Sequence, residues 1–148
     1  MDQIDEVRLG QMLPLRGGER VLEVGPGAFP AAAVVHEIEQ DFTTLPYGAG
    51  DFDVAASLWT VRRTGRPELL VAELARVTKP GGRILVVDQI APVDPLAALD
   101  LNRAAREQDT TVTRVLAEGD LRALFDANSL TLRREEVVAD VGWFVLTR

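Results

Sequence analysis

A short apolar run that ends in a glycine turn constrains the fold of this sequence most. Residues 21–24 read Val-Leu-Glu-Val, and Gly25-Pro26-Gly27 follow at once. Such a run predicts a short parallel strand buried on both faces. The glycines predict a tight turn that a ligand can approach closely. Glu23 and the turn, Glu-x-Gly-x-Gly, indicate the nucleotide-binding corner of an open α/β sheet. The pattern is not Gly-x-Gly-x-x-Gly and no Lys-Ser/Thr follows, so it does not predict a phosphate cradle.

Composition excludes several classes of function. The 148 residues predict one domain, residues 1–148, and the net charge of −7 disfavours nucleic acid and anionic membrane surfaces as partners. No cysteine is present and His36 is the single histidine, so thiolate and multi-histidine metal sites are excluded. No apolar run could cross a bilayer and the N-terminus has no signal-peptide pattern, which predicts a cytoplasmic protein.

A second block of residues specifies the family. Residues 79–83 read Lys-Pro-Gly-Gly-Arg, and an apolar run ending in Asp88 follows. With the Glu-x-Gly-x-Gly turn, this block resembles the class I S-adenosylmethionine-dependent methyltransferases. The type it resembles is the small-molecule one related to ubiquinone and menaquinone methylation, the methyltransferase type 11 domain. The resemblance implies a Rossmann-like α/β sheet with a C-terminal antiparallel hairpin, S-adenosylmethionine as cofactor, S-adenosylhomocysteine as product and a small-molecule acceptor.

The apolar periodicity along the chain predicts elements that fit this sheet. We expect helices over residues 2–13, 67–77 and 120–127, strands over 21–24, 34–40, 51–59 and 83–88, and a hairpin of 130–138 with 141–147. Residues 92–117 are predicted to form a helical cap. In related enzymes this insertion roofs the acceptor pocket.

The sequence is shorter than the family pattern between the glycine turn and Asp41-Phe42. The family has a helix, a strand ending in a ribose-binding acid and a further helix there, whereas only residues 28–33 precede the next strand here. One helix-strand-helix unit is therefore missing. A parallel crossover usually takes about a dozen residues. Two alternatives remain: strand 34–40 is antiparallel to the first strand, or Pro30 starts a truncated helix.

The resemblance also assigns cofactor-binding residues. Glu23 would orient the turn and the amino end of S-adenosylmethionine, and Gly25 and Gly27 would admit its backbone. Asp41 and Phe42 would hold the adenine. Leu58 should face the site, since ligands of open α/β sheets bind beyond the carboxyl ends of the strands.

Several other roles stay open at this point. Glu37 and Glu39 are possible substitutes for the missing ribose-binding acid. Phe29 stands where the family commonly has a third glycine, and its ring either fills space left by the lost helix or occludes the cofactor pocket.

No catalytic residue is assigned from the sequence. The candidates for a general base are His36, Tyr47 and Asp88, and no spacing singles one out. Arg103, Arg106 and Arg114 are candidates to contact a carboxylate or phenolate acceptor, with surface salt bridges as the alternative. The arginines of residues 60–66 are expected in a solvated loop, and an anion contact is the less favoured reading.

Two functions and one assembly follow as expectations. The favoured function is methyl transfer from S-adenosylmethionine to a small molecule. The alternative is a methyltransferase-like protein that binds or cyclises a small molecule, or serves as a partner subunit. The missing unit would leave strand 34–40 as an exposed sheet edge with apolar Val34, Val35 and Ile38, which predicts a symmetric homodimer.

Overall fold

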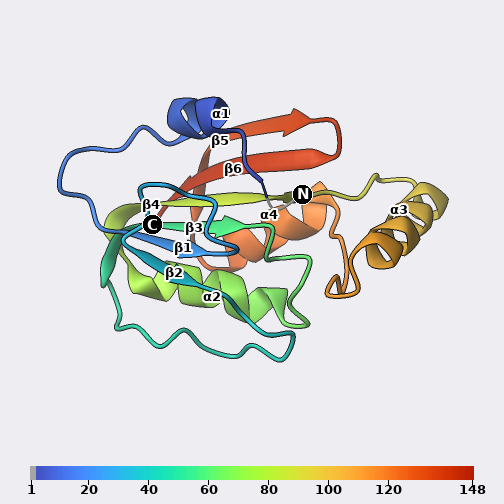
Figure 1. Cartoon of the computed structure of the whole chain (residues 1–148), viewed down its shortest axis with the longest axis horizontal. Helices are drawn as coiled ribbons and strands as arrows, with labels where there is room; N and C mark the ends of the chain where they lie inside the picture. The colour runs from blue at the N-terminus through green and yellow to red at the C-terminus, as the bar shows by residue number, and fades with distance from the viewer. Residues whose placement is uncertain (1–2) are drawn as a thin grey trace.

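The computed structural model describes residues 3–148, which form one six-stranded sheet with helices on both faces (Figure 1). The elements in chain order are α1 (Glu6–Met12), β1 (Val21–Val24), β2 (Val34–His36), β3 (Phe52–Leu58), α2 (Pro67–Val77), β4 (Thr78–Gln89), α3 (Pro95–Gln108), α4 (Glu118–Ala127), β5 (Thr131–Val138) and β6 (Val141–Thr147). Within these residues no helix is long and apolar enough to span a bilayer.

The sheet has the strand order β2-β1-β3-β4-β6-β5. Strands β2, β1, β3 and β4 run parallel to one another, while β6 is antiparallel to both β4 and β5. Strand β1 is buried along its whole length, as its apolar run predicted. The α/β class and the C-terminal antiparallel hairpin expected from the sequence are confirmed.

Each face of the sheet carries its own core. On one face α2 and α4 pack through Leu70, Leu74, Leu121 and Phe125. On the other face α1 packs Leu9 and Met12 against Trp143 of β6. Phe29 completes this second core from the segment between β1 and β2. That segment therefore does part of the covering that a helix would do.

Helix α3 stands apart from the body (Figure 1). It packs on the segment that follows it, through a separate small cluster that includes Ala105, Val112 and Val115. The Asn102 side chain accepts a hydrogen bond from the Val115 N–H at 2.7 Å and donates to the Val115 carbonyl at 3.2 Å. Asp94 caps the helix, accepting from the Ala97 N–H, and Pro95 is the first helical residue.

The connection between β1 and β2 corrects both alternatives drawn from the sequence. Strand β2 is parallel to β1, with Leu22 opposite Val34, and residues 28–33 contain no helix. Because β1 and β2 are so short, the connection between them must run back along the sheet by the length of only two or three strand residues, about 7–10 Å. Residues 25–33, extended, could cover about 30 Å. The usual minimum length assumes longer strands and a helix, so it does not apply here.

Other boundaries also differ from the expected ones. The first helix begins at Glu6, after the cap Asp5, and not at Asp2, which lies outside the described residues. Strand β2 ends at His36 and not at residue 40, because the chain then turns away from β1. Of the predicted helical cap 92–117, residues 95–108 are helical and the remainder is a loop. A cap over the acceptor stays a prediction.

Candidate functional site

The carboxylate of Glu23 folds the turn after β1. Its oxygens accept hydrogen bonds from three consecutive backbone N–H groups, those of Gly27 (2.5 Å), Ala28 (3.1 Å) and Phe29 (2.5 Å). The side chain is fully buried. A buried carboxylate is stable only with such compensation, so the acid and the turn require each other.

Gly25 opens the turn towards β3. A Cβ atom at this position would lie 2.7 Å from the Leu58 carbonyl oxygen and 3.0 Å from Glu23 Oε2. Gly27 adopts a φ of +88°, a conformation that disfavours a side chain. Glycine at residue 25 is thus required by the close approach of the turn to β3, and it leaves this wall of the cleft without a side chain.

A cleft of about 740 Å³ lies beside this bare turn, beyond the carboxyl ends of β1, β2 and β3. Its volume is in the range of small-molecule sites, and its position is the one where open α/β sheets bind ligands. The wall-forming residues are Gly25, Pro26, Glu37, Ile38, Glu39, Gln40, Thr60, Arg63, Asp109, Thr110 and Thr111.

A second hollow of about 730 Å³ adjoins the cleft across Pro26 and Glu37, which line both. Residues of the N-terminal segment form its other side, among them Gln3, Ile4 and Glu6. Gly27 opens into this second hollow. Gly25 therefore lines the cleft, and Gly27 lines the adjoining second hollow.

An ion pair joins two walls of the cleft. Arg63 Nη2 lies 2.8 Å from Asp109 Oδ2, and the Thr113 hydroxyl donates to the Arg63 carbonyl at 3.0 Å. Gln40 Nε2 donates to the Thr113 hydroxyl at 3.1 Å. Hydrogen bonds from Thr111, together with the Arg63 guanidinium, lower the pKa of Asp109 to about 2. This carboxylate is therefore charged at any ordinary pH.

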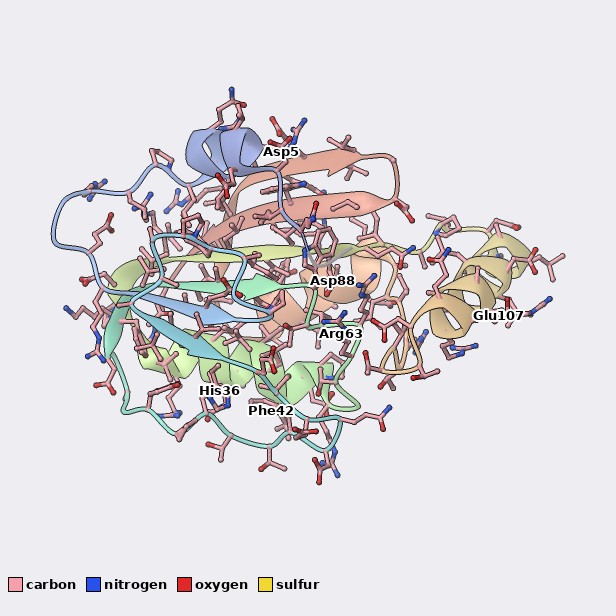
Figure 2. The ribbon with its side chains drawn as sticks, in the orientation of Figure 1. Asp5, His36, Phe42, Arg63, Asp88 and Glu107 are labelled. Atoms are coloured by element: carbon pink, nitrogen blue, oxygen red, sulfur yellow. The ribbon has the colours of Figure 1, made fainter. Side chains whose placement is uncertain are left out.

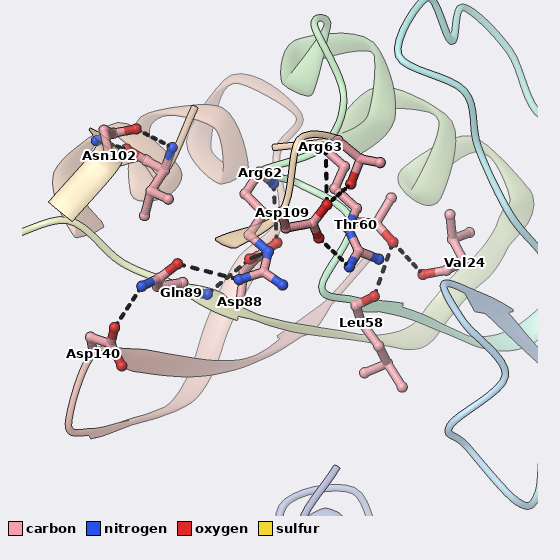
Figure 3. Close-up of polar contacts among 12 residues, drawn as sticks. Val24, Leu58, Thr60, Arg62, Arg63, Asp88, Gln89, Asn102, Asp109 and Asp140 are labelled. Carbon is pink, nitrogen blue, oxygen red and sulfur yellow. Dashed lines mark hydrogen bonds and ion pairs between the residues drawn. The ribbon is translucent and has the colours of Figure 1, made fainter. Parts of the chain in front are cut away.

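A buried polar network lies beneath that wall (Figure 3). Arg62 and Asp88 are 3% and 1% exposed, with Arg62 Nε 3.7 Å from Asp88 Oδ1. Arg62 Nη1 donates to Gln89 Oε1 at 3.2 Å, and Gln89 Nε2 donates to Asp140 Oδ2 at 2.6 Å. Burial raises the pKa of the Asp88 carboxyl to about 6, against the lowering effect of Arg62.

The structure brings together part of the predicted cofactor set. Of that set, Gly25 lines the cleft and Gly27 lines the second hollow. Glu37 and Glu39, the possible substitutes for the ribose-binding acid, also line the cleft. Leu58 and Phe42 are buried in the two cores and Asp41 is exposed, and none of these three lines either hollow. Their contact with adenine, like every cofactor assignment here, stays a prediction.

The candidate bases lie outside the cleft. His36 Nδ1 and the Tyr47 hydroxyl are 3.3 Å apart, and Tyr47 stacks edge-on against Phe52. Figure 2 shows His36 and Phe42 away from Asp88. Asp88 is sealed beneath Arg62.

The predicted acceptor-binding arginines do not line the cleft either. Arg103 pairs with Asp100 at 3.2 Å on the exposed side of α3, and Arg106 reaches the Thr113 carbonyl. Arg63 is the cleft's cation instead. No sequence pattern marks Gln40 or residues 109–111 as cleft residues, because their contacts join segments far apart in the chain.

Comparisons with known proteins agree with this geometry. Residues 19–86 match the family described as "Methyltransferase domain". The demethylmenaquinone methyltransferase of Mycobacterium tuberculosis is 37% identical over 75 residues, 51% of this chain and 32% of that protein. That of Renibacterium salmoninarum is 30% identical over 115 residues, 72% of this chain and 47% of that protein. The chain thus spans less than half the length of these relatives.

Solved structures match over most of the chain. A candidate methyltransferase from Bacillus halodurans superposes with a TM-score of 0.78 and 25% identity, covering 89% of this chain and 68% of that one. The S-adenosylmethionine-dependent methyltransferase of Mesorhizobium loti gives 0.74 and 14% identity over 96% of each chain, which shows the fold alone.

The parallel sheet, its final antiparallel strands and the Glu23 turn define a class I S-adenosylmethionine-dependent methyltransferase fold. Within that class, residues 19–86 resemble the methyltransferase-domain family. The expected fold is confirmed.

Proposed function

We propose that this protein transfers a methyl group from S-adenosylmethionine to a small-molecule acceptor. The observation that carries the proposal is the turn after β1, which Glu23 folds through the N–H groups of residues 27–29 at the edge of a 740 Å³ cleft that Gly25 lines. A side chain at residue 25 would collide with the Leu58 carbonyl and displace this turn from the edge of the cleft. The residues present therefore fit the group.

We assign the adenosine half of the cofactor to the cleft. Glu37 follows β2, the strand beside β1, and is the acid placed to accept hydrogen bonds from the ribose hydroxyls. It takes the place of the acid lost with the missing unit. Glu39, Gln40 and Thr60 supply further polar groups along the same wall.

The charges of the cleft suit a cation. Arg63 is paired with Asp109, whereas Glu37 and Glu39 form no ion pair within residues 3–148. S-adenosylmethionine supplies an electrophilic methyl on a sulfonium, which becomes a neutral thioether after transfer. Two uncompensated carboxylates stabilise the positive form more than the neutral one.

The chain's own contribution to the reaction is positioning. Methyl transfer is an in-line displacement, in which holding the partners together and excluding water lowers the barrier most. A base is needed only for an acceptor that must lose a proton. We place the acceptor on the side of the cleft covered by residues 109–111. The named relatives act on demethylmenaquinone, and a small aromatic acceptor is the class we propose here.

Titration calorimetry with S-adenosylmethionine and S-adenosylhomocysteine tests the proposal. We expect both to bind, and Gly25→Ala to abolish binding because the new Cβ contacts the Leu58 carbonyl. Gly10→Ala is the matched control, since nothing lies within 4 Å of a Cβ there. No heat at millimolar ligand with the wild-type protein would refute the proposal.

Two further expectations remain proposals. A symmetric homodimer through the β2 edge is one, and cytoplasmic location is the other. Binding of the cofactor without transfer to any acceptor would favour the alternative function, a methyltransferase-like protein that binds or cyclises a small molecule. The [4+2]-cyclase SpnF has the same fold, with a TM-score of 0.67 at 18% identity.

A further inference from the structure

A single buried residue, Arg62, connects three parts of the site (Figure 3). Its guanidinium reaches Asp88 and Gln89 at the carboxyl end of β4. Its backbone N–H donates to Asp88 Oδ2 at 3.2 Å. Its carbonyl accepts from the N–H groups of Thr113 (2.7 Å) and Arg114 (3.1 Å). Arg62, in the turn after β3, therefore contacts both the carboxyl end of β4 and the segment after α3.

Neither Arg62 nor Asp88 lines the cleft, but the residues beside Arg62 do. Thr60 and Arg63 are cleft walls, and Asp109 is held to Arg63. The orientation of Arg62 thus fixes where these walls lie. Any change that frees its side chain loosens the cleft without removing a residue that contacts the ligand.

Burying the Arg62–Asp88 ion pair has a cost in free energy, because both charges lose their hydration. Taking two charges out of water generally offsets their attraction, and apolar replacements of buried pairs are often as stable. Loss of one partner is a different matter, because the other charge is then left buried. The presence of the buried pair is therefore weak evidence for a gain in stability.

We propose that Arg62 and Asp88 are positioning residues of the cofactor cleft, which is ordered when Asp88 is ionised and loosened when Asp88 is neutral. This inference rests on the proposed function for the identity of the ligand. The charged group facing Asp88 is the Arg62 guanidinium. The Gln89 backbone N–H donates to Asp88 Oδ1, whereas the Gln89 side chain donates to the Asp140 carboxylate. Arg63 lies one residue further and is engaged by Asp109.

The pH dependence has a distinctive sign. The folded pKa of Asp88 is raised from 3.8 to about 6, so its contribution to stability is largest at low pH and is lost as pH rises through about 6. Cleft order has the opposite dependence. Between pH 7.5 and pH 5 we expect the S-adenosylmethionine dissociation constant to rise about tenfold, since one proton with this pKa competes with the ordered cleft. A role in stability alone would not move affinity in this direction.

The test measures affinity against pH in the wild type, Asp88→Asn and Arg66→Gln. Asp88→Asn should bind about tenfold more weakly at pH 7.5 and show no pH dependence between 5 and 7.5. Arg66 is exposed on the same loop, so Arg66→Gln should follow the wild type. A tight, pH-independent Asp88→Asn, or one that keeps the wild-type profile, would overturn the inference.

A second measurement needs no ligand and separates this inference from the proposed function. We expect amide hydrogen exchange at Thr113 and Arg114 to quicken about tenfold in Asp88→Asn, while the Leu130 amide, bonded to Phe125, is unchanged. If Asp88→Asn does not fold, the double variant Arg62→Met/Asp88→Asn removes both charges and gives the same comparison. Unchanged exchange at 113 and 114 would overturn the positioning role. Quickened exchange without cofactor binding would instead refute the proposed function alone.

Discussion

At the scale of single residues, Phe29 decides how the missing helix is replaced. Its side chain is 5% exposed and packs in the core with Leu9 and Met12, while its N–H donates to Glu23. This packing favours the space-filling interpretation of the two drawn from the sequence. We expect Phe29→Gly to cost about 3–5 kcal/mol in the free energy of unfolding, with no gain in cofactor affinity. Denaturant unfolding and calorimetry measure the two effects. Tighter cofactor binding by the variant would show that the ring occludes the pocket.

Glu73 of α2 holds the long connection after β2 in place. Its carboxylate accepts from the Thr44 hydroxyl at 2.5 Å and the Leu45 N–H at 2.8 Å, and pairs with Arg76. Hydrogen bonding from Arg76, more than any other contact, lowers the pKa of Glu73 from 4.5 to about 2. The resulting stability is present above pH 4.5 and is lost as pH falls towards 2.

Glu73→Gln should therefore lower the free energy of unfolding at pH 7 by roughly 1–3 kcal/mol. The difference from the wild type should shrink between pH 4.5 and pH 2.5, where the wild type itself loses this contribution. Urea unfolding across that range measures it. Glu68→Gln, at an exposed position of the same helix, is the control. A difference that stays constant with pH would mean that Glu73 does not anchor this connection.

At the scale of elements, β2 is the exposed edge of the parallel part of the sheet. The edge extends over only Val34–His36, and Val35 is 48% exposed. A short edge offers few free backbone groups for pairing, although strands at an edge still attract partners. We propose a dimer there and expect Val35→Lys to convert it to a monomer. Light scattering at micromolar concentration measures the mass, and Val7→Lys, on exposed α1, is the control. A monomeric wild type would refute the dimer.

At the scale of the whole molecule, charge should favour the cofactor over its product. The chain carries a net charge of −7, and the cleft has two carboxylates without ion pairs in the described residues. Raising salt from about 20 to 500 mM shortens the screening length severalfold. S-adenosylmethionine affinity should fall roughly two- to fivefold, while that of neutral S-adenosylhomocysteine should hardly change. Calorimetry at the two salt concentrations measures both affinities. In the double variant Glu37→Gln/Glu39→Gln, we expect the two ligands to show the same salt dependence. Equal salt dependence for both ligands would contradict it.

The sequence by itself determined the elements whose signals are local. The buried run 21–24, the helix 67–77 with its initial proline and the final hairpin depend on periodicity and turn residues within a few positions of each other. The Glu23 turn belongs with them, because the acid and the N–H groups it accepts lie within six residues. These patterns were enough to predict the fold class.

Only the tertiary structure decided how the shortened region closes and what forms the cleft. The direction of β2 depended on the distance between the end of β1 and the start of β2, which no residue pattern encodes. The pairing of Arg63 with Asp109 joins segments 46 residues apart, and Arg62 meets Asp88 across 26. Such contacts arise because packing brings strand ends and loops to one edge of the sheet. Residue type alone could nominate an arginine after β3, but only the folded chain determined that Arg62 is buried and Arg63 faces the cleft.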